Sequence, residues 1–143
     1  MLDYMRKKYG EVFVDEEAYG GQPGKAYTMR RMHSLGRPEE SILVRALGRE
    51  EVVFQDNYLA YLLRDEIEER MHALAGPVFG KCKVYYRIPA LVFPPEFAAD
   101  MEAEEFLKNP LSMVRVYIYV RDIPADVRAQ LAAFLSSVAG KNY

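Results

Sequence analysis

The chain has 143 residues, of which half are apolar or aromatic and 28% are charged, a composition typical of a soluble globular protein. Its net charge of −2 gives no electrostatic reason to expect nucleic acid or an anionic membrane as a partner. A single cysteine, Cys82, excludes a disulfide within the chain. No apolar run approaches the roughly 18 residues of a membrane span. We therefore expect a single domain over residues 1–143, with no transmembrane segment.

The first part of the chain predicts one helix followed by short strands. The helix covers residues 2–9, has basic residues in its last turns and ends at Gly10. Glycine and proline place a loop at 19–24, and turns are expected at 35–40 and 48–50. Strands are expected over 11–15, 26–33, 41–47 and 51–54. Short connections between consecutive strands predict antiparallel pairing.

The central part of the chain predicts one long amphipathic helix over residues 56–76. Asp56 can cap its first turn, and Gly76 with Pro77 is expected to end it. The opposite face is rich in acidic residues and arginines, which is typical of a solvated surface. Apolar residues recur at three- and four-residue steps along one face: Leu59, Leu62, Leu63, Ile67, Met71 and Leu74. Such a helix is expected to lie on a sheet.

The last part of the chain predicts two further strands and two helices. The strands cover 81–88 and 112–120. A short helix at 103–107 is expected to be capped by Asp100 and to stop at Asn109–Pro110, and a final helix covers 124–139. The apolar stripe of the final helix consists of Val127, Leu131, Phe134, Leu135 and Val138.

This order of elements predicts the fold class. It is a two-layer α+β domain, with a mainly antiparallel, curved sheet of about four to five strands and helices packed on one face. Cystatin-like folds are one example of such an arrangement. The sequence contains no internal repeat and no linker that would divide it.

Tyrosine is the unusual residue of this chain, with eleven copies and no tryptophan. In the strand 112–120 the even-numbered residues are all aliphatic from Val114 onward, so they are expected to face the helices. The candidate interaction face on the open side consists of Tyr85, Arg115, Tyr117 and Tyr119. The alternative interpretation is a half-covered sheet face whose hydroxyls reach water.

No stretch of the sequence carries a catalytic or metal-binding signature. His33 and His72 are far apart and belong to no metal-ligand spacing, so we predict no metal, no cofactor and no catalytic residue. Cys82 lies in an apolar strand pattern and is expected to be a buried, inert thiol. An enzyme would require a cavity in which one of the histidines meets a carboxylate.

Four stretches together resemble a group of small, uncharacterised proteins of Gram-positive bacteria. They are Tyr4–Phe13, residues 56–68, Lys81–Tyr85 and Phe93–Phe97. Many members of that group carry an export or lipoprotein signal ahead of a helix that ends in Lys-Tyr-Gly. The resemblance implies a location at the cell envelope, and it implies no activity, cofactor or substrate. No signal segment opens this chain, so the cytoplasm stays open as the alternative.

Two functions are favoured by the sequence over an enzyme with a pocket between the long helix and the sheet. The first is a non-enzymatic binding or accessory domain of the cell envelope, with a protein or peptide partner or a homodimer contacting the tyrosine face. The alternative is a small cytoplasmic protein of the immunity or inhibitor type. Neither hypothesis involves nucleic acid.

Overall fold

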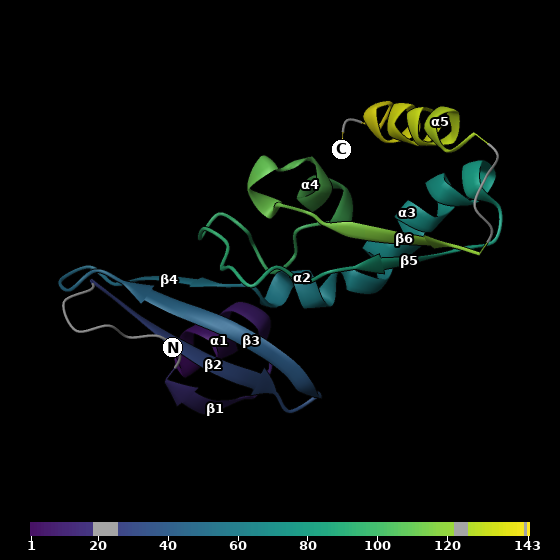
Figure 1. The fold of residues 1–143 in the computed structure, drawn as a ribbon. Coiled ribbons are helices and arrows are strands. Elements are labelled where there is room, and N and C mark those ends of the chain that lie inside the picture. The colour runs from purple at the N-terminus through teal and green to yellow at the C-terminus, as the bar shows by residue number, and fades with distance from the viewer. Residues whose placement is uncertain (19–25, 122–125, 142) are drawn as a thin grey trace. The chain divides into compact units, whose positions relative to one another are not determined.

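A computed structural model describes residues 1–18, 26–121, 126–141 and 143 (Figure 1). The loop predicted at 19–24 and the predicted helix start at Pro124 lie outside the described residues. The described residues confirm the α+β fold class and the antiparallel pairing. The strands form two sheets, one of four strands and one of two, where the sequence suggested a single sheet of four to five.

The chain divides into two compact units, which are described separately. The first unit contains residues 1–62 and 89–101, and the second contains residues 63–88 and 102–143. The prediction of a single domain stays a prediction.

The first unit is built on the four-stranded sheet. Its strands are antiparallel and lie in chain order. The turn predicted at 35–40 is shorter than expected, because the Ser34 hydroxyl accepts a hydrogen bond from the Gly36 N–H and the chain reverses at once. The elements of this unit are α1 (Leu2–Tyr9), β1 (Phe13–Ala18), β2 (Tyr27–Ser34), β3 (Arg37–Leu47), β4 (Val53–Asp56) and α2 (Tyr58–Leu62).

The core of the first unit lies between α1 and one face of this sheet. Gly10 ends α1 in the left-handed conformation, as predicted, with φ of 71°. Alternate residues of β2 and β3 point toward the helix because successive strand side chains face opposite sides. The buried cluster consists of Met5, Phe13, Met32, Ile42, Val44 and Tyr58.

A glycine closes the connection between β3 and β4. Gly48 has φ of 91°, and a Cβ atom at this position would lie 2.1 Å from the carbonyl oxygen of Glu51. No side chain fits there, so only glycine permits this turn. The turn fixes the pairing of the two strands, in which Ala46 lies opposite Phe54 and Val44 opposite Asp56.

The carboxylate of Asp56 is the centre of a buried polar network. Asp56 is 1% exposed. Its Oδ2 accepts hydrogen bonds from the Tyr4 hydroxyl at 2.7 Å and from Lys8 Nζ at 2.8 Å. Its Oδ1 accepts from the Tyr9 hydroxyl at 2.6 Å and from the backbone N–H of Tyr58 at 2.9 Å. Asp56 therefore caps the first turn of α2, as predicted, and also binds α1 to the end of β4.

Three tyrosine hydroxyls of the first unit are held in their neutral form. Burial, followed by the negative charge of Asp56, raises the pKa of Tyr4 and of Tyr9 well above the ordinary tyrosine range. Burial, with a hydrogen bond to the Glu11 carboxylate at 2.7 Å, raises the pKa of Tyr58 to about 12. These hydroxyls therefore act as donors to fixed carboxylates.

The second unit is built on a two-stranded antiparallel sheet that packs against a helix. The helix α3 contacts both strands, and α4 and α5 also pack against α3. Its elements are α3 (Arg64–Phe79), β5 (Cys82–Tyr86), α4 (Ala103–Lys108), the 3-10 helix η1 (Pro110–Ser112), β6 (Val116–Val120) and α5 (Val127–Ala139).

The single long helix expected over 56–76 is capped at its start by Asp56 as predicted, but it is wrong in the middle and at its C-terminal end. It is divided at Leu63, whose ψ of −2° separates α2 from α3. The reason is that the apolar stripe serves two cores: Leu59 is buried in the first unit and Ile67 in the second. At the other end α3 continues through Pro77 and ends at Gly80 with φ of 67°.

Pro77 is tolerated inside α3 because it lies in the last turn. Proline lacks the N–H that would reach the carbonyl of Ala73, four residues earlier. Ala73 is exposed, so water can satisfy that carbonyl. The final turn is closed instead by the Gly80 N–H, which donates to the Gly76 carbonyl at 2.8 Å.

Two further boundaries differ from the prediction. The N-cap of α4 is Glu102 and not Asp100, and no side chain caps it. The strand predicted over 112–120 starts only at Val116, because Met113 adopts a left-handed conformation with φ of 47° after the 3-10 turn. Asn109 caps that turn, its Oδ1 accepting from the Leu111 N–H at 2.9 Å.

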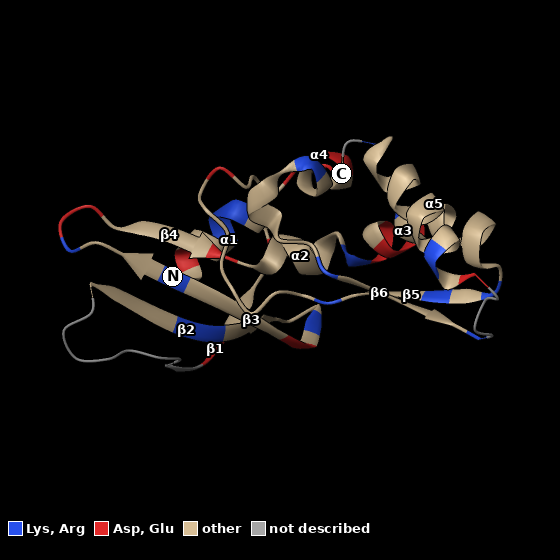
Figure 2. Cartoon of the chain, turned by 45° about the horizontal axis from the view of Figure 1, so that its top comes forward, with Lys and Arg blue, Asp and Glu red and all other residues tan. Residues whose placement is uncertain are grey.

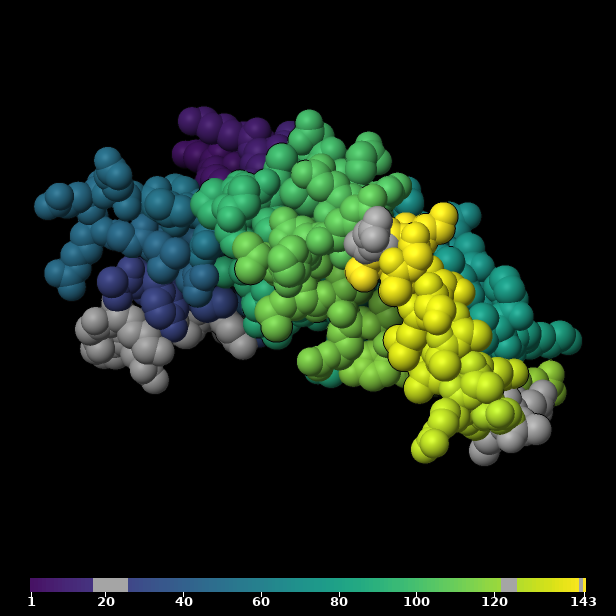
Figure 3. Space-filling view, turned by 90° about the horizontal axis from the view of Figure 1, so that it is seen from above, coloured from purple at the N-terminus to yellow at the C-terminus, as the bar shows by residue number. Residues whose placement is uncertain are grey.

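The predicted apolar stripe of α5 is mostly exposed, which corrects the sequence interpretation. Leu131 is 49% exposed, and Val127 and Leu135 are also at the surface. Figure 3 shows α5, drawn in yellow and yellow-green, at the surface of the molecule. The side of α5 that is turned inward carries Phe134, whose ring lies 5.6 Å from that of Phe79. Only one large side chain of this helix is therefore buried.

The difference between α3 and α5 predicts unequal responses to matched truncations. Ile67→Ala removes a side chain that is 0% exposed, so we expect a loss of about 2–5 kcal/mol in the free energy of unfolding. Leu131→Ala shortens an exposed side chain and is expected to change the free energy of unfolding by less than about 0.5 kcal/mol. Urea denaturation of both variants measures the two values, and equal losses would show that α5 is buried in solution.

The tyrosine network predicts that the protein loses stability in alkali. Unfolded tyrosines release their protons near pH 10, whereas the folded chain keeps those of Tyr4, Tyr9 and Tyr58. The folded state then binds more protons, so the free energy of unfolding falls as pH rises above about 10 and through the raised pKa values. The Tyr9→Phe variant lacks one of these ionisable hydroxyls. Its free energy of unfolding should therefore fall less than that of the unmodified protein between about pH 9 and about pH 11. Equal slopes for the two proteins contradict this account.

Candidate functional site

The candidate interaction face predicted from the sequence forms on the sheet of the second unit. Tyr85 pairs directly with Tyr117 across the two strands, and Lys83 pairs with Tyr119. All three tyrosines are exposed, Tyr119 by 61%. Arg115 is exposed as well, and its carbonyl accepts a hydrogen bond from the Arg87 N–H at 3.0 Å, which continues the ladder by one pair. The structure therefore brings Tyr85, Arg115, Tyr117 and Tyr119 onto one side.

Four basic residues share this side and were missed by the sequence analysis. They occupy odd-numbered positions in or next to β5 and β6, as the tyrosines do, and all are exposed: Lys81, Lys83, Arg87 and Arg121. Figure 2 shows blue segments along and beside both strands. The signal in the sequence was the alternation of Lys, Lys, Tyr, Arg over 81–87 and of Arg, Tyr, Tyr, Arg over 115–121. The net charge of the whole chain concealed it.

We call this surface the basic-aromatic face. It consists of Lys81, Lys83, Tyr85, Arg87, Arg115, Tyr117, Tyr119 and Arg121, and contains no Asp or Glu. In the part of the chain that the structure describes, no carboxylate pairs with its two lysines, Arg115 or Arg121. A chain of net charge −2 therefore presents a locally positive surface.

The arginines act directly on the tyrosine beside them. Arg87 Nη1 donates a hydrogen bond to the Tyr117 hydroxyl at 3.3 Å. This hydrogen bond, together with the nearby charge of Arg115, lowers the pKa of Tyr117.

The opposite side of the sheet fixes the face in place. A two-stranded sheet has little stability of its own. Here α3 backs it: Tyr86 is fully buried, and its backbone N–H donates to Glu68 Oε1 of α3 at 2.8 Å. Val116 and Ile118 are half-buried on that side, as predicted, whereas Val120 at the end of β6 is exposed.

The two histidines lie in different units, and His72 and Cys82 line common hollows of the second unit without a hydrogen bond between them among the described residues. His33 Nδ1 lies 2.8 Å from Glu16 Oε1 in the first unit, and His72 is exposed on α3 in the second. Cys82 is half-buried, which corrects the expectation of a buried thiol, because it lies near the end of β5. Among the described residues, no three His, Cys, Asp or Glu side chains gather as a metal site would require.

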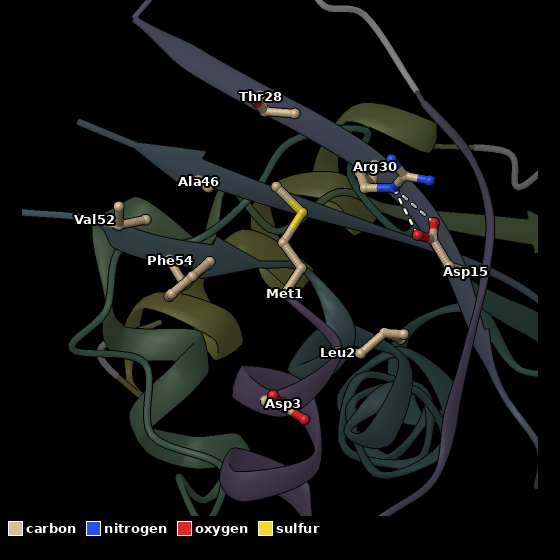
Figure 4. A pocket seen from close by; sticks show the side chains of 9 residues that line it. All are labelled: Met1, Leu2, Asp3, Asp15, Thr28, Arg30, Ala46, Val52 and Phe54. Atoms are coloured by element: carbon tan, nitrogen blue, oxygen red, sulfur yellow. Dashed lines mark hydrogen bonds and ion pairs between the residues drawn. The ribbon is translucent and has the colours of Figure 1, made fainter. Parts of the chain in front are cut away.

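One open concavity of about 590 Å³ lies in the first unit (Figure 4). Its residues come from α1 and from the sheet, and the one basic side chain among its described residues, Arg30, is paired with Asp15 at 2.7 Å. The cation is therefore neutralised, and the remaining surface is mostly apolar. The lining residues are Met1, Leu2, Asp3, Asp15, Thr28, Arg30, Ala46, Val52 and Phe54.

A second concavity, of about 630 Å³, lies at one end of the basic-aromatic face. Among the residues that the structure describes, its lining includes four basic side chains and no carboxylate. Its lining residues are His72, Gly80, Lys81, Cys82, Lys83, Tyr119, Val120 and Arg121. Of the two concavities, this one retains positive charge that a ligand could neutralise, so the candidate site is the basic-aromatic face with this concavity.

Comparison with known proteins adds little to this description. No family model and no curated protein matches the chain. One solved structure that matches is a DUF5037 family protein from Ruminococcus gnavus, with 15% sequence identity and a TM-score of 0.48. The match covers 96% of this chain and 66% of that one, so the chain spans about two thirds of its length. A likeness at this level assigns neither family nor activity. No described helix is long and apolar enough to cross a membrane.

Proposed function

We propose that this protein is a non-enzymatic binding domain whose basic-aromatic face holds a short acidic segment of a partner protein. The observation that carries the proposal is the gathering of five basic residues and three tyrosines, without a carboxylate, on one side of β5 and β6. Arginine and tyrosine are the residues most enriched where proteins bind one another. Their charge selects a partner segment of opposite sign.

The size of the face suits a short, extended segment. Each strand has five residues, which corresponds to a length of about 17 Å at roughly 3.4 Å per residue. An extended peptide of about five residues covers this length. Lysine and arginine lie at both ends of the face and tyrosines at its centre. Aspartate or glutamate side chains can therefore pair with the ends while apolar groups contact the rings.

The charge distribution disfavours two other occupants. A long polyanion such as nucleic acid extends past the face, and the rest of the chain is acidic, with Asp65, Glu66 and Glu69 on α3 alone. A symmetric dimer through this face would place one basic face against another, and like charges opposite each other are repulsive. A separate acidic partner avoids both difficulties.

We also propose that the domain works at the bacterial cell envelope. The support is the resemblance of four of its stretches to small exported proteins of Gram-positive bacteria. A binding role fits such a location, because an accessory domain there needs a partner surface rather than a catalytic centre.

The first test measures binding of a fluorescent peptide rich in Glu, Asp and Tyr by anisotropy. We expect saturable binding that weakens as salt rises from about 0.05 to about 0.5 M, because exposed charges are screened. Arg87→Gln/Arg115→Gln removes two cations from one end of the face. If each exposed ion pair contributes roughly 0.2–1 kcal/mol, affinity should fall about 2- to 30-fold.

The matched control changes the same charge elsewhere. Arg49→Gln/Arg128→Gln removes two exposed arginines that lie outside the face, and should leave the affinity unchanged. The proposal is wrong if both double variants lose affinity equally, or if a lysine-rich peptide binds as well as the acidic one. Tighter binding of a single-stranded oligonucleotide would assign the face to nucleic acid instead.

The location is tested by fractionating cells of the source bacterium and probing each fraction with an antibody against this chain. We expect the protein in the envelope or the medium, because many of the proteins that its stretches resemble carry export signals. Recovery with a cytoplasmic marker enzyme would contradict the envelope proposal and favour the immunity or inhibitor alternative.

A further inference from the structure

The concavity at the end of the basic-aromatic face combines positive charge with apolar surface. Lys83 lies in β5, Lys81 directly precedes that strand, and Arg121 directly follows β6. Three permanent cations therefore border a space of about 630 Å³, which lies within the range of small-molecule sites in proteins. Such a volume is larger than a simple inorganic ion needs.

The electrostatics of the concavity favour a ligand with more than one negative charge. The described residues of its lining include no Asp or Glu. Glu68 and Glu69 line a neighbouring hollow together with His72, Cys82 and Lys83. A phosphomonoester carries close to two charges at neutral pH and offers three acceptor oxygens. Lysine and arginine side chains are the usual partners of such a group.

The remaining surface of the concavity favours a planar ring. Tyr119, whose side chain is exposed, lines it from one side of the sheet, and Val120 and Cys82 line it as apolar neighbours from the next pair of the ladder. Stacking of a base or another flat ring on a tyrosine stabilises binding without requiring a particular ring. A ligand that joins a ring to a phosphate would use both parts of the lining.

From these contacts we propose that the concavity binds a small phosphomonoester attached to a planar ring, the chemical class of the mononucleotides. The inference goes beyond the proposed partner binding and does not require it. Because Lys81, Lys83, Tyr119 and Arg121 belong to both sites, the bound small molecule competes with the acidic segment. Occupancy of the concavity would then regulate capture of the partner.

Cys82 provides a direct reporter of this site. It is the only cysteine of the chain, it is half-buried and it lines the concavity. Neutral iodoacetamide modifies the thiol without being attracted to the cations, and mass spectrometry measures the rate. With adenosine 5′-monophosphate as the probe, at ten times its dissociation constant, modification should slow about tenfold by mass action. Adenosine and inorganic phosphate should each protect far less.

Two double variants separate this site from the partner site. Lys83→Gln/Arg121→Gln should abolish protection, whereas Arg87→Gln/Arg115→Gln should retain it and lose only peptide affinity. Circular dichroism checks that each variant is folded, and the single variants Lys83→Gln and Arg121→Gln should each reduce protection. The inference is overturned if saturating nucleotide leaves the rate unchanged, or if adenosine protects equally. If the peptide binds but the nucleotide does not protect Cys82, the proposed partner binding stands and the nucleotide site does not. If the nucleotide protects but the peptide does not bind, the nucleotide site stands and the proposed partner binding does not.

Discussion

The first unit depends on one buried negative charge. A carboxylate removed from water is costly unless every oxygen finds donors. Asp56 meets this requirement with donors from Tyr4, Lys8 and Tyr9 of α1 and from the first turn of α2. Its backbone carbonyl also accepts the Phe93 N–H at 2.8 Å, which fixes the returning segment 89–101 to the end of β4. One residue therefore joins helix, strand and returning segment, and α1 or α2 cannot move away without leaving the buried charge short of donors.

The contrast between the two units shows what the sequence could predict. The end of α1 at Gly10 and the position of Tyr117 and Tyr119 on one open side of β6 follow from local rules, and the structure confirms both. The division at Leu63 and the exposure of Leu131 depend on which surfaces other elements cover. Periodicity identifies an apolar side of a helix, but it does not report whether anything packs against that side. The missed features are therefore those determined by long-range packing.

The basic-aromatic face illustrates the same limit for charge. Its residues come from two separate stretches of the chain, 81–87 with three basic residues and 115–121 with two. Antiparallel pairing places Lys83 beside Tyr119 and Tyr85 beside Tyr117, and only then do the charges add. A net charge summed over the whole chain averages such a surface with the acidic sides of α3 and α4. Local charge per face, obtained after strand pairing, is the informative quantity for recognition.

The turn at Gly48 has a consequence for how the first unit is assembled. Side chains alternate along a strand, so the pairing register of β4 decides whether its even- or odd-numbered residues face α1. In the observed register Phe54 stacks on Tyr4, with ring centroids 5.0 Å apart, and Asp56 points inward. A bulkier residue at 48 would widen the turn, and a shift of one residue would exchange Asp56 for Gln55 or Asn57. Lys8 would then face the core without a counterion, so the misaligned hairpin is rejected by electrostatics as well as by shape.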